Sequence, residues 1–157
     1  MTSAMTSLDN SPPDYPTAGQ LERTLSQKIQ ALYRDQLGHQ PSKVTCQFFG
    51  TQLVIVLESS ITPLEQRLNQ AGQADLARQV RHQLSQIMKP LVGATVEAVS
   101  QVSVTEVLSD ASLTTGRTGI IASLEDTPLV RNPEAIPKIK RSRLKLAEPN
   151  ADLDLSS

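Results

Sequence analysis

The chain of 157 residues is predicted to form a small α+β domain, a two-layer sandwich with helices on one face of an antiparallel sheet. Three observations predict this class. The chain opens its periodic part with an amphipathic helical pattern, and two strand-like segments follow it. A second, longer helical pattern and a second pair of strand-like segments come next. The expected order is therefore helix, strand, strand, long helix, strand, strand.

The periodic apolar residues are confined to the middle of the chain. Both ends are rich in proline and small polar residues and have no apolar period, so they bury too little apolar surface to offset the entropy of ordering. We expect a disordered N-terminal tail over residues 1–19 and a single domain over 20–124. The remaining residues, 125–157, are expected to form a disordered C-terminal tail.

The first helix is predicted over residues 20–37. Its apolar residues recur at helical spacing and leave the charged residues on the other side. Gly38 can take the left-handed conformation that commonly ends a helix, and a proline follows it shortly after. The apolar positions are Leu21, Leu25, Ile29, Leu32 and Leu37.

Two strands should follow this helix. Val44, Cys46 and Phe48 alternate with polar residues, which is typical of a half-buried strand. A turn at Gly50 leads into residues 53–57, LVIVL, which are apolar on both faces. Such a strand is either central and covered on both sides or covered by a second subunit. On this ground we expect a homodimer.

The next segment carries agreeing signals for a helix start. Thr62 can cap the helix, Pro63 fits its first position, and Glu65 completes a capping box. Gly72 predicts a bend or break near residues 70–73, and Pro90 predicts a kink or an end near Met88. We expect one apolar face on this long helix, made of Leu64, Leu68, Leu76, Val80, Leu84, Ile87 and Leu91.

The second strand pair is predicted from Val102 to Leu108 and from Gly119 to Leu124, with a polar loop around Gly116 between them. Together with the first pair, these strands complete a sheet of four, because two strands alone are not stable.

Residues that could carry catalysis or bind a metal are few and scattered. His39 and His82 lack the spacing of metal ligands and are expected to be exposed to solvent, while Cys46 is expected to be a buried free thiol. No pair of carboxylates is placed for acid–base work by its spacing, and no glycine-rich phosphate loop is present. We therefore expect no enzyme, no catalytic residue, no cofactor and no metal.

The charge distribution provides the one candidate binding segment. The net charge is −1, and residues 20–124 are near neutral with nine basic and eight acidic residues. A basic run between residues 138 and 145 could bind nucleic acid, a lipid headgroup or an acidic partner, although a solvated segment that keeps the protein soluble is the favoured explanation. Its basic residues are Lys138, Lys140, Arg141, Arg143 and Lys145.

The expected location is the cytoplasm. The chain does not open with a signal peptide, and none of its apolar runs approaches the ~20 residues that cross a bilayer. Contact with a membrane would then be made at its surface or through a partner.

Residues 20–124 resemble the MpsC family of small bacterial and archaeal proteins. The resemblance lies in YRDQLGHQP at the end of the first helix, IVLESSITPLEQRL at the strand-to-helix junction, LARQVRHQLSQIMKPL in the long helix, and EVLSD in a strand. Two departures stand out. The first turn lacks the usual glycine directly before Pro41, and Ser59-Ser60 replaces a frequent glycine.

The resemblance implies a role but no catalytic residues. Members are described as a component of a sodium-translocating, membrane-potential-generating system that also supports inorganic-carbon uptake. We therefore expect a non-enzymatic accessory or interaction domain that supports a membrane sodium or bicarbonate transport system, with transport subunits as partners. The alternative is a polyanion binder that acts through the basic run.

Overall fold

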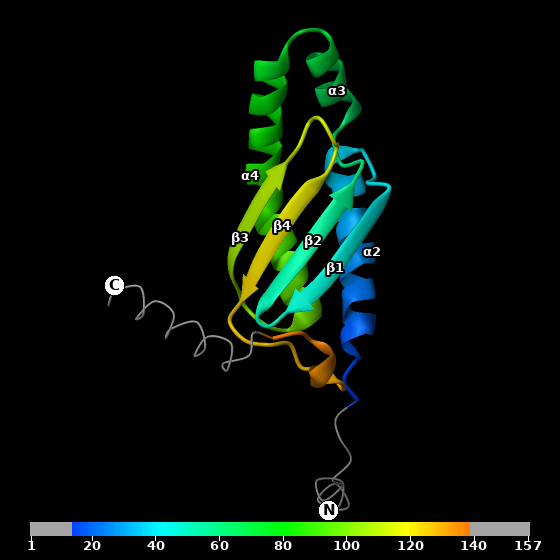
Figure 1. The fold of residues 1–157 in the computed structure, drawn as a ribbon, viewed down its shortest axis with the longest axis vertical. Coiled ribbons are helices and arrows are strands. Elements are labelled where there is room, and N and C mark those ends of the chain that lie inside the picture. Colours follow the sequence, from blue (N-terminus) through cyan, green and yellow to red (C-terminus); the bar gives the residue numbers. More distant parts are fainter. Residues whose placement is uncertain (1–13, 139–157) are drawn as a thin grey trace, which may run out of the picture.

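The fold is the predicted α+β sandwich. The computed structural model describes residues 14–138, so the expected tails over 1–13 and 139–157 lie outside the described residues. The elements in chain order are α2 (Ala18–Leu37), β1 (Lys43–Phe49), β2 (Gln52–Glu58), α3 (Pro63–Gln70), α4 (Ala74–Ser100), β3 (Val104–Ala111), β4 (Thr118–Leu124) and a 3-10 turn, η1 (Pro133–Ala135). Helices α2 and α4 lie behind the sheet in Figure 1.

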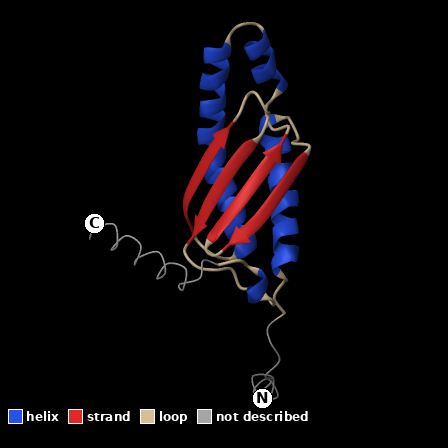
Figure 2. Cartoon of the chain, in the orientation of Figure 1, coloured by secondary structure: helices blue, strands red, loops and turns tan. Residues whose placement is uncertain are grey.

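The four strands form one antiparallel sheet in the order β1-β2-β4-β3. The two hairpins meet along β2 and β4, where Ile55 pairs with Ile120. Residues on the helix-facing side of these central strands are fully or nearly fully buried, and the other side of the sheet faces the viewer in Figure 2. The buried strand residues are Cys46, Phe48, Leu53, Ile55, Leu57, Ile120, Ala122 and Leu124.

Strand β2 is central, as expected, but the helices cover only one of its faces. Leu53, Ile55 and Leu57 are completely buried against the helices, whereas Val54 is 37% exposed on the opposite side. The apolar residues on the second face therefore do not belong to the core of this chain.

Helix α2 confirms the prediction for residues 20–37 and begins two residues earlier. The Thr17 side chain accepts a hydrogen bond from the Gln20 amide, and the Gln20 side chain accepts one from the Thr17 amide. This reciprocal capping box satisfies two amides that a helix start leaves without partners. At the other end Gly38 takes the left-handed conformation, with φ 67°.

The predicted start of the second helical region is confirmed, and its break separates two helices. Thr62 caps α3, Pro63 is in its first turn, and Glu65 completes the capping box. The chain turns at residues 71–73 and begins again as α4. Pro90 does not end α4, which continues to Ser100. Because Pro90 is exposed, water can satisfy the carbonyl of Gln86 that lacks a helical donor.

The expected apolar face of this region is not its core face. Leu64, Leu76 and Ile87 are 63%, 44% and 55% exposed. The part of α4 that packs inward is instead the row Ala77, Arg81, Met88, Val92 and Val96. The hairpin of α3 and the start of α4 extends beyond the ends of the strands, as Figure 1 shows. Ile87 is exposed because it lies on a different side of α4 from the buried row.

Residues 125–138, which we expected to lie in a disordered tail, are packed against the domain. Val130 and Ile136 are 7% and 3% exposed within the core. Backbone groups fix the segment, since the Arg131 amide donates to the Pro16 carbonyl and the Gly50 amide donates to the Pro137 carbonyl. The prolines prevent regular structure here, but irregular backbone still buries apolar side chains. We call residues 125–138 the C-terminal clasp.

Candidate interaction surfaces

The open face of the sheet carries an apolar row across three strands. Val54 pairs with Ile121, and Ile121 pairs with Leu108, so the three side chains lie side by side. They are 37%, 41% and 50% exposed. Next to the row, Gly119 pairs with Val56, and a Cβ atom there would meet nothing within 4 Å. We call Val54, Ile121 and Leu108 the sheet-face row.

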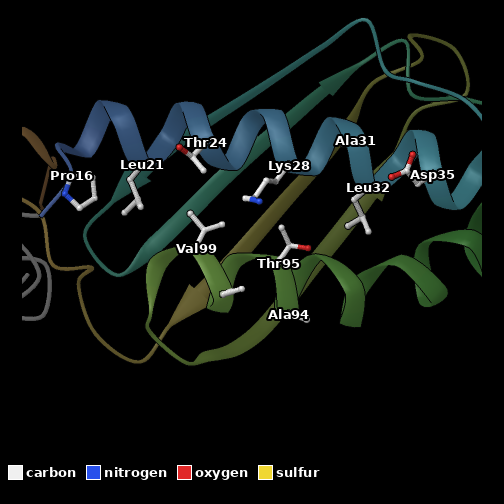
Figure 3. Close-up of a pocket in the computed structure, with 11 residues that line it drawn as sticks. Pro16, Leu21, Thr24, Lys28, Ala31, Leu32, Asp35, Ala94, Thr95 and Val99 are labelled. Carbon is white, nitrogen blue, oxygen red and sulfur yellow. The ribbon is translucent and has the colours of Figure 1, made fainter.

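A groove lies on the opposite side of the molecule, between α2 and α4. Its volume is about 800 Å³. Figure 3 shows small α4 residues facing α2 across it, with Lys28 and Asp35 of α2 among the lining residues. The groove exists because α4 has small side chains where it passes α2, which leaves space between the two helix backbones. The α4 residues that line it are Ala94, Thr95, Ala98 and Val99.

A buried ion pair joins α3 to α4 at the base of their hairpin. The Arg81 guanidinium donates to both carboxylate oxygens of Glu65 at 2.6 Å, and also to the Ser60 carbonyl at 3.2 Å. The side chains are 7% and 0% exposed. Burial raises the pKa of the nearby Tyr33 hydroxyl to about 12, while the positive charge of Arg81 opposes that rise. The arrangement fixes the helices and leaves no free group for chemistry.

Glu65 was predicted as a capping residue, but its ion pair was not. The residues around position 81 form the polar side of a helix in the sequence, and Arg81 is instead buried. The signal that could have located it is its spacing from Ala77 and Met88 on the core side of α4.

The Ser59-Ser60 turn is held by contacts from three segments. Ser59 takes a positive φ of 52°, a conformation that glycine adopts more readily than other residues. The His39 Nε2 atom lies 2.8 Å from the Ser59 carbonyl oxygen. The Ser60 hydroxyl donates to the Gly116 carbonyl at 2.9 Å and lies 2.7 Å from the Thr118 hydroxyl. These contacts tie the turn to the β3–β4 loop.

The titratable residues singled out from the sequence do not come together. Cys46 is a buried free thiol, as predicted, and burial raises its pKa to about 11. His39 is half-buried against Ser59, whereas His82 is exposed on α4. Within residues 14–138, no three histidine, cysteine or acidic side chains are grouped to hold a metal ion.

A small charged hollow was not predicted, because its residues come from separate elements. It measures about 310 Å³ between α4 and the end of β3 and is lined by Arg78, His82, Lys89 and Asp110, among others. Asp75 pairs with Arg78 beside it. Acidic groups therefore offset part of its positive charge.

The basic run is mostly beyond the described part of the chain. Lys138 is exposed and follows the Pro137 carbonyl that contacts Gly50. Lys140, Arg141, Arg143 and Lys145 lie outside the described residues. Of the helices in the described range, none is long and apolar enough to span a bilayer.

One of three comparisons with known proteins matches the region that forms the sandwich. Comparison with curated proteins and with solved structures gave no match. One family model matches residues 17–126, from the cap of α2 to just past β4. Its description is "Na+-translocating membrane potential-generating system (MpsC)". Because the match covers more than half of the 157 residues, the chain belongs to the MpsC family.

Proposed function

We propose that this domain is a non-enzymatic accessory subunit that works in the cytoplasm and binds a subunit of a membrane sodium or bicarbonate transport system. Family membership supports the link to a sodium-translocating system. The sheet-face row is the observation that supports a binding role. It places three large apolar side chains in register on a face that no helix within residues 14–138 covers.

The sheet-face row has the chemistry of the centre of a protein–protein interface. An apolar cluster that excludes water contributes most to affinity, and polar residues around it contribute to specificity. Polar neighbours are present. Gln47 pairs with Val54, and Ser123 follows Ile121 by two residues on the same face of β4. On the same face Glu58 accepts a hydrogen bond from Arg117 at 2.8 Å. The proposed occupant is the cytoplasmic part of a transport subunit.

The test is a pull-down from native membranes with the full chain as bait. We expect the wild type to recover a membrane-spanning subunit of a sodium or bicarbonate transporter. Leu108→Asp should lose it, because a carboxylate in the apolar row would have to be desolvated. Leu129→Asp is the matched control, since Leu129 is 63% exposed and lies outside the row.

The same experiment separates the proposal from polyanion binding. Retention through the basic run would fall steeply as salt is raised, whereas an apolar contact would persist. If recovery of the partner is lost at high salt but is unchanged by Leu108→Asp, the result would favour binding through the basic run. Failure of the wild type to recover any transport subunit would refute the proposal.

A further inference from the structure

One side of α4 carries a regular apolar stripe beside the row of fully buried core residues. Ile87 is exposed there, Val80 and Leu84 are half-buried, and Leu91 packs against the edge of the core. The residues of the stripe recur at spacings of four and three, the heptad pattern of a coiled-coil seam. Ile87 at its middle is 55% exposed, and Leu76, one turn before it begins, is 44% exposed. We call this set the outer stripe: Val80, Leu84, Ile87, Leu91, Ala94 and Ala98.

The outer stripe changes size along its length. Its first half holds the larger side chains Val80, Leu84 and Ile87. Its last two residues are Ala94 and Ala98, and these line the groove between α2 and α4. One end of the stripe therefore carries the larger side chains, and the other end borders the groove.

We infer that this stripe is the interface between two copies of the chain, whose α4 helices pair antiparallel about a two-fold axis. The antiparallel arrangement matches large residues to small ones. When Ile87 lies opposite the second copy's Leu91, Leu84 lies opposite Ala94, and Val80 lies opposite Ala98. In this pairing the larger end of each stripe packs at the groove of the other copy, which makes one surface complementary to itself.

The charges on α4 permit this pairing. Helical periodicity places Asp75, Arg78 and Lys89 on the opposite side from the outer stripe, and Arg81 is buried with Glu65. Glu97 borders the stripe and accepts a hydrogen bond from the Val104 amide. In the antiparallel pairing it would lie near the second copy's Gln83, so like charges do not meet.

The size of the face suits a small dimer interface. From Val80 to Ala98 the stripe is ~27 Å long, and with α2 beside its small end it is about two helix diameters, ~20 Å, wide. The resulting face of about 540 Å² lies below the about 800 Å² per partner of a standard interface, at the low end of the size range. The inference is independent of the transport role, and it places the expected homodimer on α4 and leaves the sheet-face row free.

The first test measures oligomeric state by light scattering of the full chain at micromolar concentration. We expect a dimer for the wild type and a monomer for Ile87→Asp, whose buried charges should weaken association at least ~100-fold. Because Ile87 is exposed in the single chain, its circular dichroism spectrum should be unchanged. Leu108→Asp, on the sheet-face row, is the control and should remain a dimer.

The second test reports the register. Leu84→Cys and Ala94→Cys are made as separate variants, with Cys46 buried and unreactive in both. In the proposed pairing, residue 84 faces residue 94 of the other copy, while identical positions lie ~15 Å apart along the helix. Mild oxidation of the mixture should give a covalent dimer, and oxidation of either variant alone should not.

Several outcomes would overturn the inference. A monomeric wild type would do so, as would a dimer that survives Ile87→Asp. Dissociation by Leu108→Asp alone would assign the dimer to the sheet face. Equal crosslinking of each single variant would rule out the antiparallel register, and a monomer that binds a foreign helix would assign the stripe to another protein.

Discussion

The Glu65–Arg81 pair is the residue-level contact that holds the hairpin of α3 and α4 in place. Both charges are withdrawn from water, so each depends on the other and on the Ser60 carbonyl for compensation. Thr62 adds a further hydrogen bond to the Glu65 carboxylate at 2.8 Å. The pair therefore contributes to positioning the helices more than to net stability.

Removing one member of the Glu65–Arg81 pair should destabilise the fold. We expect Glu65→Ala to lower the free energy of unfolding by about 3–5 kcal/mol, because it leaves the Arg81 charge buried and uncompensated. Urea denaturation measures the change. Arg34→Ala, which breaks the exposed contact with Asp35, is the control and should cost less than about 1 kcal/mol. A cost for Glu65→Ala no larger than that of the control would show that Arg81 finds water when its partner is removed.

Single residues were predictable where the cause is local. The capping roles of Thr62 and Glu65 follow from a four-residue pattern, and the buried thiol of Cys46 follows from alternation within one strand. The ion pair was not predictable, because residues 65 and 81 meet only after the chain reverses between α3 and α4. The Ser59 turn likewise depends on contacts with the distant Gly116.

At the scale of elements, helix ends were easier to predict than helix faces. Gly38 and the break near Gly72 were correctly interpreted because their effect is on the local backbone. The inward face of α4 was predicted incorrectly, because leucine, valine and isoleucine were taken to mark the core. The core row includes Ala77 and Arg81, while the outer stripe includes larger apolar residues such as Leu84 and Ile87. Periodicity alone cannot rank two adjacent apolar rows on one helix.

The two long helices end in the same left-handed conformation with different residues. Gly38 ends α2 with φ 67°, and Gln101 ends α4 with φ 60°. A residue other than glycine loses about 1–2 kcal/mol of folding free energy in this conformation. Part of that loss is offset, because glycine gives up more conformational entropy on folding. We expect Gln101→Gly to raise the free energy of unfolding by roughly 0.5–1 kcal/mol.

The reverse substitution is the matched comparison. Gly38→Gln should lower the free energy of unfolding by about 1 kcal/mol, and only through the backbone, because a Cβ atom at Gly38 would meet nothing within 4 Å. Thermal and urea unfolding of both variants measure the two effects. If Gln101→Gly destabilises the chain, the hydrogen bond from the Gln101 side chain to the Ala98 carbonyl outweighs the strain.

For the whole molecule, the fold class and the order of elements were predictable. The pairing of the two hairpins and the set of exposed apolar residues were not. Local periodicity identifies helices and strands one at a time, and it correctly predicted two hairpins with helices on one face. It does not determine that β2 and β4 are the neighbours that join the hairpins. Nor does it indicate which apolar residues remain outside, because that depends on which side of α4 packs on the sheet.

The C-terminal clasp leads to a prediction about the extent of the folded unit. It buries Val130 and Ile136 and lies against the start of α2, where the Ala18 amide donates to the Asn132 side chain at 2.8 Å. A chain that ends at Leu124 would lose these contacts and expose the core residues beneath them. Burial of two such side chains stabilises by about 3–6 kcal/mol in total.

Two truncations separate the clasp from the residues beyond it. We expect the chain ending at Lys138 to unfold in urea as the full chain does, because every described clasp contact is retained. The chain ending at Leu124 should unfold at clearly lower urea, and its midpoint should recover in part if only the residues through Asn132 are restored, since Val130 returns while Ile136 does not. Equal midpoints for the two truncations would mean that the domain is stable without the clasp.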